Sequence, residues 1–130
     1  MKKLWRASKK QIKNSNLKRY ESYLSAKYNI NFKNNYDKIF DWSIKNKSDF
    51  WESIWDFCKV KGTKGKKKFK NSKKFYKNLF LPDYKLNFAE NILSKRDSTK
   101  AITFISENGF RQERSWYDFN KNVNKVINYF

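Results

Sequence analysis

The 130-residue sequence contains no histidine, a single cysteine, a single proline and only three glycines. The absence of histidine excludes Ser-His-Asp triads, HExxH metal sites and imidazole general bases. Because Cys58 is alone, an intrachain disulfide and a multi-cysteine zinc site are also excluded, which favours a reducing compartment. No apolar run approaches the ~20 residues of a membrane helix, and residues 1–5 lack the apolar stretch of a signal peptide. We therefore expect a cytoplasmic protein.

Acidic residues are scarce as well. The sequence has 12 Asp and Glu against 31 Lys and Arg, a formal net charge of +19. A large positive charge is compatible with a polyanionic partner. Only five of the basic residues are arginine, however, and proteins that read phosphates or bases usually rely on the bidentate arginine fork. Two interpretations stay open: solvated lysines supplied by AT-rich codons, or a surface that binds a polyanion.

Aromatic residues are abundant instead, at 19% of the chain. This content can bury a core, so the sequence is not a disordered basic tail. The length corresponds to one domain at most. We expect an α+β fold, with a mainly helical segment over residues 1–96 followed by a β-hairpin and a helix over residues 97–130.

Four helical segments are predicted in the first half. Ser8 and Gln11 have the spacing of a capping box and predict a short helix. A second helix is expected over residues 15–28, where Leu17, Tyr20, Leu24 and Tyr28 recur at helical spacing. Residues 29–31 should end it. A third helix carries an apolar face of Tyr36, Ile39, Phe40, Ser43 and Ile44.

Ser48 is predicted to cap a fourth helix over residues 49–58. Its apolar stripe is formed by Trp51, Ile54, Trp55 and Cys58 and widened by Phe50 and Phe57. Core packing explains such a stripe better than ligand stacking does. Cys58 lies on the stripe and is predicted to be a buried structural thiol, since no histidine could activate it.

Residues 59–77 form the basic stretch, with ten lysines in nineteen residues. They show no sustained apolar period before Phe75, which predicts a mobile loop. Residues 62–65 read Gly-Thr-Lys-Gly and match the GxxG spelling of a KH nucleic-acid loop. The spelling is weak evidence, because the helices and sheet of a KH domain are missing around it. No Walker A loop is present.

The remaining sequence changes character twice. Asn87 is predicted to cap a short helix with Glu90 in the capping-box position, and residues 95–99 look like a polar linker. Residues 101–105 then form a β-rich run, Asn108-Gly109 predicts a hairpin turn, and residues 110–114 form the return strand. Ser115, with Asp118 in the box position, should cap a final helix whose apolar face consists of Trp116, Phe119, Val123, Val126, Ile127 and Phe130.

A lone hairpin is marginally stable in water, and this helix has a wide apolar face. The region from residue 97 therefore reads as the opening of a larger α/β domain. If so, Trp116, Val123, Ile127 and Phe130 should lack a complete partner surface, whereas a finished module should bury them.

Two blocks carry a family resemblance: residues 50–58, which read FWESIWDFC, and residues 86–93, which read LNFAENIL. Together with Leu4-Trp5 they resemble the N-terminal region of acetoacetyl-CoA synthetase, an adenylate-forming enzyme close to acetyl-CoA synthetase. The resemblance extends over nearly the whole chain. It departs from the family in the basic stretch, which is richer in lysine here.

This resemblance implies a two-step ligase. The carboxylate of acetoacetate attacks the α-phosphate of Mg-bound ATP, and the thiol of coenzyme A then displaces AMP from the acyl-adenylate. The Ser/Thr/Gly-rich loop ending in Pro-Lys-Gly that the family uses is missing from these 130 residues. No catalytic, ATP-binding, coenzyme A-binding or metal-binding residue is therefore assigned here, although the full-length family enzyme needs ATP, Mg and coenzyme A.

The resemblance implies a structural role for this segment, with Trp51, Trp55 and Phe88 as packing residues and the remainder of the synthetase as the partner. Asp56 and Glu90 are acidic, but Glu90 is explained as a cap. The alternative is a stand-alone lysine-rich module that binds nucleic acid or another polyanion through residues 59–77.

Overall fold

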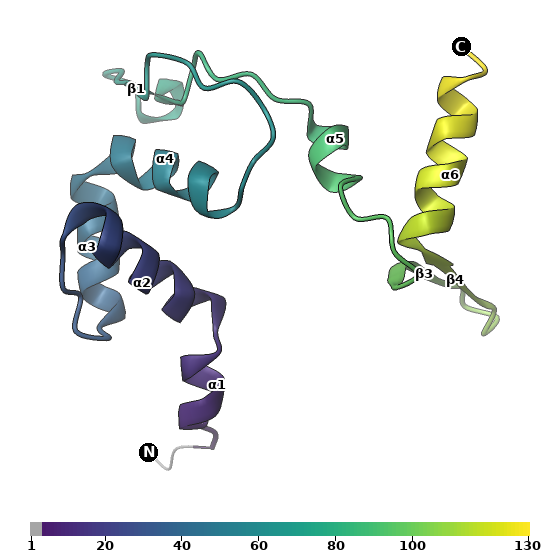
Figure 1. The fold of residues 1–130 in the computed structure, drawn as a ribbon, viewed down its shortest axis with the longest axis horizontal. Helices are drawn as coiled ribbons and strands as arrows, with labels where there is room; N and C mark the ends of the chain where they lie inside the picture. Colours follow the sequence, from purple (N-terminus) through teal and green to yellow (C-terminus); the bar gives the residue numbers. More distant parts are fainter. Residues whose placement is uncertain (1–3) are drawn as a thin grey trace. The chain divides into compact units, whose positions relative to one another are not determined.

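The computed structural model describes residues 4–130. The expectation about a signal peptide rests partly on residues 1–3, which lie outside this range. The described residues form an α+β fold of six α-helices, one 3-10 turn and two small antiparallel sheets (Figure 1). Two compact units divide the chain, Met1–Lys85 and Leu86–Phe130. The expected domain boundary after residue 96 stays a prediction.

The first unit begins with helices that the sequence signals place correctly. Helix α1 (Lys9–Lys13) has Ser8 as its N-cap, and the reciprocal capping box with Gln11 is formed. Ser15 caps α2 (Asn16–Tyr28), whose C-cap Asn29 adopts the left-handed conformation at φ 54°. Asparagine tolerates this region better than most residues, which explains why the helix ends there. Asn35 caps α3 (Tyr36–Lys45).

Helix α4 (Lys47–Phe57) begins earlier than predicted, so the expected Ser48 cap is wrong. Asn46 is both the C-cap of α3 and the N-cap of α4. Its side-chain amide donates to the Trp42 carbonyl at 3.0 Å, and its own carbonyl accepts from the Phe50 N–H at 2.8 Å. The end of α3 therefore fixes the start of α4, and no hydroxyl cap is needed.

The core of this unit lies between α2, α3 and the turn that joins them. Leu24 is fully buried, and Tyr20, Phe32 and Ile39 are nearly so. Partly buried aromatic and aliphatic side chains pack around these four: Tyr23, Tyr28, Ile30, Trp42, Phe50, Ile54 and Phe57. The predicted core role of the aromatic stripe is confirmed for Trp55, which is buried. The outer edges of the predicted faces, including Leu17, Phe40 and Ile44, are about half exposed.

Cys58 is exposed, which contradicts the prediction of a buried thiol. It is the C-cap of α4, and its N–H donates to the Ile54 carbonyl. The next residue, Lys59, turns the chain with a φ of 52°. The helical period that would have carried Cys58 into the core therefore stops at Phe57.

The basic stretch contains regular structure, which the prediction of a loop missed. Strand β1 (Phe69–Lys70) pairs antiparallel with β2 (Leu79–Phe80), and a 3-10 turn η1 (Phe75–Lys77) lies between them. The rings of Phe69 and Phe80 are 5.1 Å apart. Thr63 and Lys85 exchange two backbone hydrogen bonds of 2.8 and 3.0 Å. Cross-strand pairing of aromatic residues thus supplies an order that helical periodicity could not reveal.

The second unit follows the predicted order. Asn87 caps α5 (Phe88–Ile92) by accepting from the Glu90 N–H. Strands β3 (Lys100–Ile105) and β4 (Arg111–Ser115) form the hairpin, and Gly109 in its turn has a φ of 81°, where glycine is favoured. Ser115 caps α6 (Trp116–Ile127) and accepts from the Asp118 N–H.

The expected linker at residues 95–99 is tied to α6. The buried Asn120 amide donates to the Lys95 carbonyl at 2.9 Å, and the Trp116 and Tyr117 N–H groups donate to the carbonyls of Thr99 and Asp97. These bonds satisfy the first amides of the helix, which have no partner inside it. The segment is therefore part of the α6 N-terminus.

Much of the apolar surface of the second unit stays exposed. Val126 is 58% exposed, Ile127 62% and Phe130 98%, whereas Trp116 and Val123 are half-buried. Phe88 is 73% exposed, so no partner for it lies within the described residues. Its predicted packing against the remainder of a synthetase stays a prediction.

Candidate functional site: the carboxylate face of helix α4

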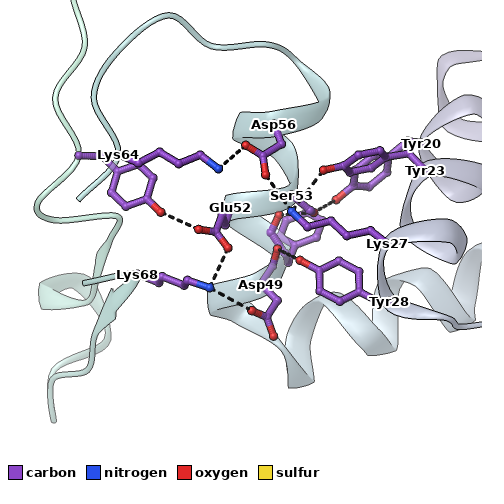
Figure 2. A network of polar contacts seen from close by, with 12 residues as sticks. Tyr20, Tyr23, Lys27, Tyr28, Asp49, Glu52, Ser53, Asp56, Lys64 and Lys68 are labelled. Atoms are coloured by element: carbon purple, nitrogen blue, oxygen red, sulfur yellow. Dashed lines mark hydrogen bonds and ion pairs between the residues drawn. The ribbon is translucent and has the colours of Figure 1, made fainter. Parts of the chain in front are cut away.

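Three carboxylates lie on one face of α4, at Asp49, Glu52 and Asp56. Residues spaced by three and four positions share a helix face. Ser53 and Trp55 on the same helix are buried, and the Glu52 side chain is only 16% exposed, so the carboxylates border the buried side of α4. Figure 2 shows lysines reaching this face from two directions, from α2 and from the basic stretch. We call this face, with the lysines that pair with it, the α4 clamp.

Two lysines of the basic stretch bind to the clamp. The Lys64 ammonium lies 2.5 Å from Asp56 Oδ1. The Lys68 ammonium lies 2.7 Å from Glu52 Oε2 and 3.7 Å from Asp49 Oδ1. From α2, Lys27 contacts Asp56 Oδ2 at 2.8 Å. Residues far apart in the chain are thus joined to one helix, and the basic stretch is held at two points.

Tyrosines complete the network. The Tyr84 hydroxyl donates to Glu52 Oε1 at 2.8 Å, and the Tyr28 hydroxyl donates to the Asp49 carbonyl at 3.0 Å. Ser53 Oγ donates to the Phe50 carbonyl at 2.6 Å. A hydroxyl has one hydrogen, so Tyr20 must be the donor in the 2.6 Å contact between Tyr20 and Ser53. Each of these buried or half-buried hydroxyls is therefore satisfied.

The ion pairs hold the clamp in its charged form. The hydrogen bond from Lys68, helped by Tyr84, lowers the pKa of Glu52 against the opposing effect of burial. Burial opposes ionisation of Asp56 too, but hydrogen bonds from Lys27 and Lys64 outweigh it and lower its pKa. Hydrogen bonding to Glu52 raises the pKa of Lys68. The carboxylates of the clamp are committed to lysines and do not form a general acid–base pair.

The described residues of the clamp offer no group of metal ligands. Within residues 4–130 no group of three or more Cys, Asp and Glu side chains is arranged to hold a metal ion. Within the GxxG segment, the Lys64 ammonium is bound to Asp56. A Cβ on Gly65 would lie 2.4 Å from the Asp83 Cβ, so this glycine permits a close contact inside the chain. The described residues thus show no cluster of metal ligands at the clamp, and Gly65 is explained by packing within the chain.

Sequence reasoning placed Asp56 among the residues of interest but missed Asp49, Glu52 and Tyr84. The spacing of the three carboxylates on a predicted helix, next to a stretch of ten lysines, could have indicated the clamp. Glu90, the other acidic residue singled out, lies in α5 and is exposed. The structure does not bring it into the network.

The clamp predicts that the first unit loses stability in acid. Because the pKa values of Glu52 and Asp56 are lowered in the fold, their stabilisation is present above the ordinary carboxylate pKa of about 4 and is lost as the pH falls below it. We expect Glu52→Gln to remove on the order of 1 kcal/mol of unfolding free energy at pH 7 and less at pH 3. Urea unfolding at both pH values measures this. Glu107→Gln, in the exposed turn of the hairpin, is the control, and an equal loss at both pH values for Glu52→Gln would contradict the prediction.

Among the described residues, no helix combines the length and the apolar character needed to cross a membrane.

Comparison with known proteins gives relatives by sequence. The acetoacetyl-coenzyme A synthetase of Rhizobium meliloti (strain 1021) is 28% identical over 123 residues, which are 95% of this chain and 19% of that protein. The acetoacetyl-CoA synthetase of Danio rerio is 25% identical over 105 residues, covering 79% of this chain and 15% of that protein. A malonamoyl-CoA synthetase of Penicillium aethiopicum is 24% identical over an alignment of 130 residues, which covers 94% of this chain and 18% of that protein. No family model matches, and no solved structure matches.

All three relatives are CoA synthetases by name, so the chain is related to that class of protein. Its resemblance to the acetoacetyl-CoA synthetases in particular is confirmed, since relatives from bacteria and vertebrates carry that name. The chain spans less than a fifth of the length of each of these relatives.

Proposed function

We propose that these residues are an N-terminal structural part of an acetoacetate–CoA ligase, which converts ATP, acetoacetate and coenzyme A to acetoacetyl-CoA, AMP and diphosphate. The observation that carries the proposal is the match to acetoacetyl-CoA synthetases over up to 95% of this chain. The ATP, Mg²⁺ and coenzyme A chemistry would be supplied by parts of the ligase that these 130 residues do not include. A cytoplasmic location belongs to the same proposal and is supported by the single cysteine, which favours a reducing compartment.

Two features of the second unit support a structural role. The β3–β4 hairpin is a sheet of two strands, so each strand has an unpaired edge within the described residues. The C-terminal part of α6 exposes Val126 and Ile127. Exposed apolar surface and open strand edges are both features that another part of a protein commonly covers. We infer that the hairpin and α6 begin the large domain of the adenylate-forming enzyme, and that the remainder of the synthetase packs against them.

The first unit supports the same role in a different way. It has its own aromatic core, and its charged groups are satisfied by one another at the α4 clamp. Trp55 packs against Tyr84 with ring centres 5.1 Å apart, and Trp51 packs against Phe80 at 5.3 Å. The tryptophans of the FWESIWDFC block therefore act in packing, and the block has no free nucleophile–base pair.

A chimera tests the proposal. The segment of the Rhizobium meliloti synthetase that matches this chain is replaced by this chain, and acetoacetyl-CoA formation is measured. We expect activity in the chimera and none in the same synthetase lacking the segment, because the segment would supply the packing surface. Val126→Glu with Ile127→Glu in the chimera should abolish activity, whereas Lys121→Glu with Lys125→Glu, on the same helix, should not. A chimera with no activity, although folded, would count against the proposal.

The 130-residue chain by itself is expected to be inactive. Without the phosphate-binding loop it cannot neutralise charge on the transferring phosphorus, so acetoacetate should not stimulate AMP formation from ATP. AMP is measured by chromatography against a blank without protein. Turnover above the blank that follows the purified chain through fractionation would overturn the proposed structural role.

A further inference from the structure

The basic stretch carries further lysines that do not pair with the α4 clamp. Residues 57–82 contain no aspartate or glutamate. Lys64 and Lys68 are bound to the clamp. Six other lysines are exposed, and within residues 4–130 none of their amines forms an ion pair with a carboxylate: Lys66, Lys67, Lys70, Lys73, Lys74 and Lys77. Six positive charges without a carboxylate partner are thus concentrated on one short segment.

Two aromatic rings lie among these charges. Phe75 is 87% exposed and Tyr76 is 71% exposed. Both belong to the 3-10 turn η1, directly after Lys74 and before the end of the turn at Lys77. Phe69 and Phe80 nearby pack against each other instead. The rings of the β1–β2 pair are thus occupied with each other, whereas the rings of η1 remain exposed.

Exposed rings between lysines match the chemistry of single-stranded nucleic acid. Phosphates bind the ammonium groups with release of counterions, and unstacked bases bind aromatic faces, whichever base is present. A duplex offers the same phosphates but keeps its bases stacked inside. The basic stretch is also held in place by Lys64, Lys68 and the β1–β2 pairing, so less conformational entropy is lost on binding than for a free lysine tail.

An anionic membrane is the competing partner for a basic surface. Lysine clusters are attracted to anionic lipid through their charge alone, and stable surface binding commonly adds an amphipathic helix that inserts an apolar face. The described elements between residues 59 and 80 are two strands of two residues and one three-residue turn, and none of them provides such a face. The charges and rings therefore favour the nucleic acid.

We propose that residues 66–77 form a binding surface for single-stranded nucleic acid, in which the lysines hold phosphates and Phe75 and Tyr76 stack on bases. Recognition is independent of base sequence, because no arginine fork or other base-reading group belongs to the surface. The proposal does not depend on the proposed ligase function, and it holds for this segment whether or not a synthetase surrounds it.

The test uses the 130-residue chain and a fluorescent oligothymidylate of about 12 nucleotides, a length within the site sizes of known single-strand binders. Fluorescence anisotropy gives the Kd at several salt concentrations. We expect Phe75→Ala with Tyr76→Ala to weaken binding to the single strand about tenfold or more and to leave binding to a duplex of equal length unchanged. Tyr76→Leu, which keeps an apolar side chain, should show part of the loss.

Charge is tested separately with matched variants. Lys73→Gln with Lys74→Gln should weaken binding and reduce the dependence of Kd on salt, whereas Lys121→Gln with Lys125→Gln on α6 removes the same charge and should change neither. Equal effects of the two lysine pairs, equal binding of single strand and duplex, or tighter binding to anionic phosphatidylserine vesicles than to the oligonucleotide would each overturn the proposal. None of these outcomes bears on the activity of the synthetase chimera, so the two proposals fail separately.

Discussion

Replacing Leu24 with alanine is expected to lower the unfolding free energy of the first unit by about 2–5 kcal/mol. Leu24 is fully buried on α2, in contact with the aromatic residues of the core. Removing its side chain loses apolar burial and leaves a cavity, which rigid aromatic rings cannot fill without leaving their rotamers. Urea unfolding monitored by tryptophan fluorescence reports on this unit through Trp42 and Trp55.

Leu17→Ala is the matched control, because Leu17 belongs to the same helix but is 47% exposed. Its effect should stay below about 1 kcal/mol. Similar destabilisation by the two substitutions would show that Leu24 does not occupy the core that the structure assigns to it.

The second large effect is expected in amide hydrogen exchange. Residues 36–58 lie in α3, α4 and the core around them, whereas residues 101–130 form a two-stranded hairpin and a helix with an exposed apolar face. Local opening is easier where few side chains are buried. In the 130-residue chain we expect residues 101–130 to exchange roughly 100-fold faster than residues 36–58.

The chimera with the Rhizobium meliloti synthetase provides the control for this measurement. If the remainder of a synthetase covers α6, protection of residues 116–127 should rise in the chimera, and protection of residues 36–58 should change little. Equally high protection of both segments in the 130-residue chain, measured on a monodisperse monomer at physiological salt, would show that the second unit is already complete and would contradict the proposed packing.

Local signals in the sequence were sufficient for most of the helices and for the hairpin. Ser8, Asn87 and Ser115 cap helices as predicted, because a cap is formed by a side chain and an amide only two or three residues away. The turn at Asn108-Gly109 is confirmed for the same reason, although only Gly109 takes a positive φ, while the Asn108 side chain accepts from the Phe110 N–H. The family resemblance was also carried by short blocks of sequence.

Local sequence signals did not determine the contacts between residues that are distant in the chain. The start of α4 at Lys47 depends on Asn46 bonding back to α3, and the order in the basic stretch depends on Lys64 and Lys68 reaching Asp56, Glu52 and Asp49 across the fold. A lysine looks the same in sequence whether it is solvated or paired. Only the tertiary structure distinguishes Lys64 and Lys68, which pair with the clamp, from the other lysines of the basic stretch. It also shows that Cys58 and Phe88 are exposed, because burial and ion pairing depend on what the rest of the chain places beside a side chain.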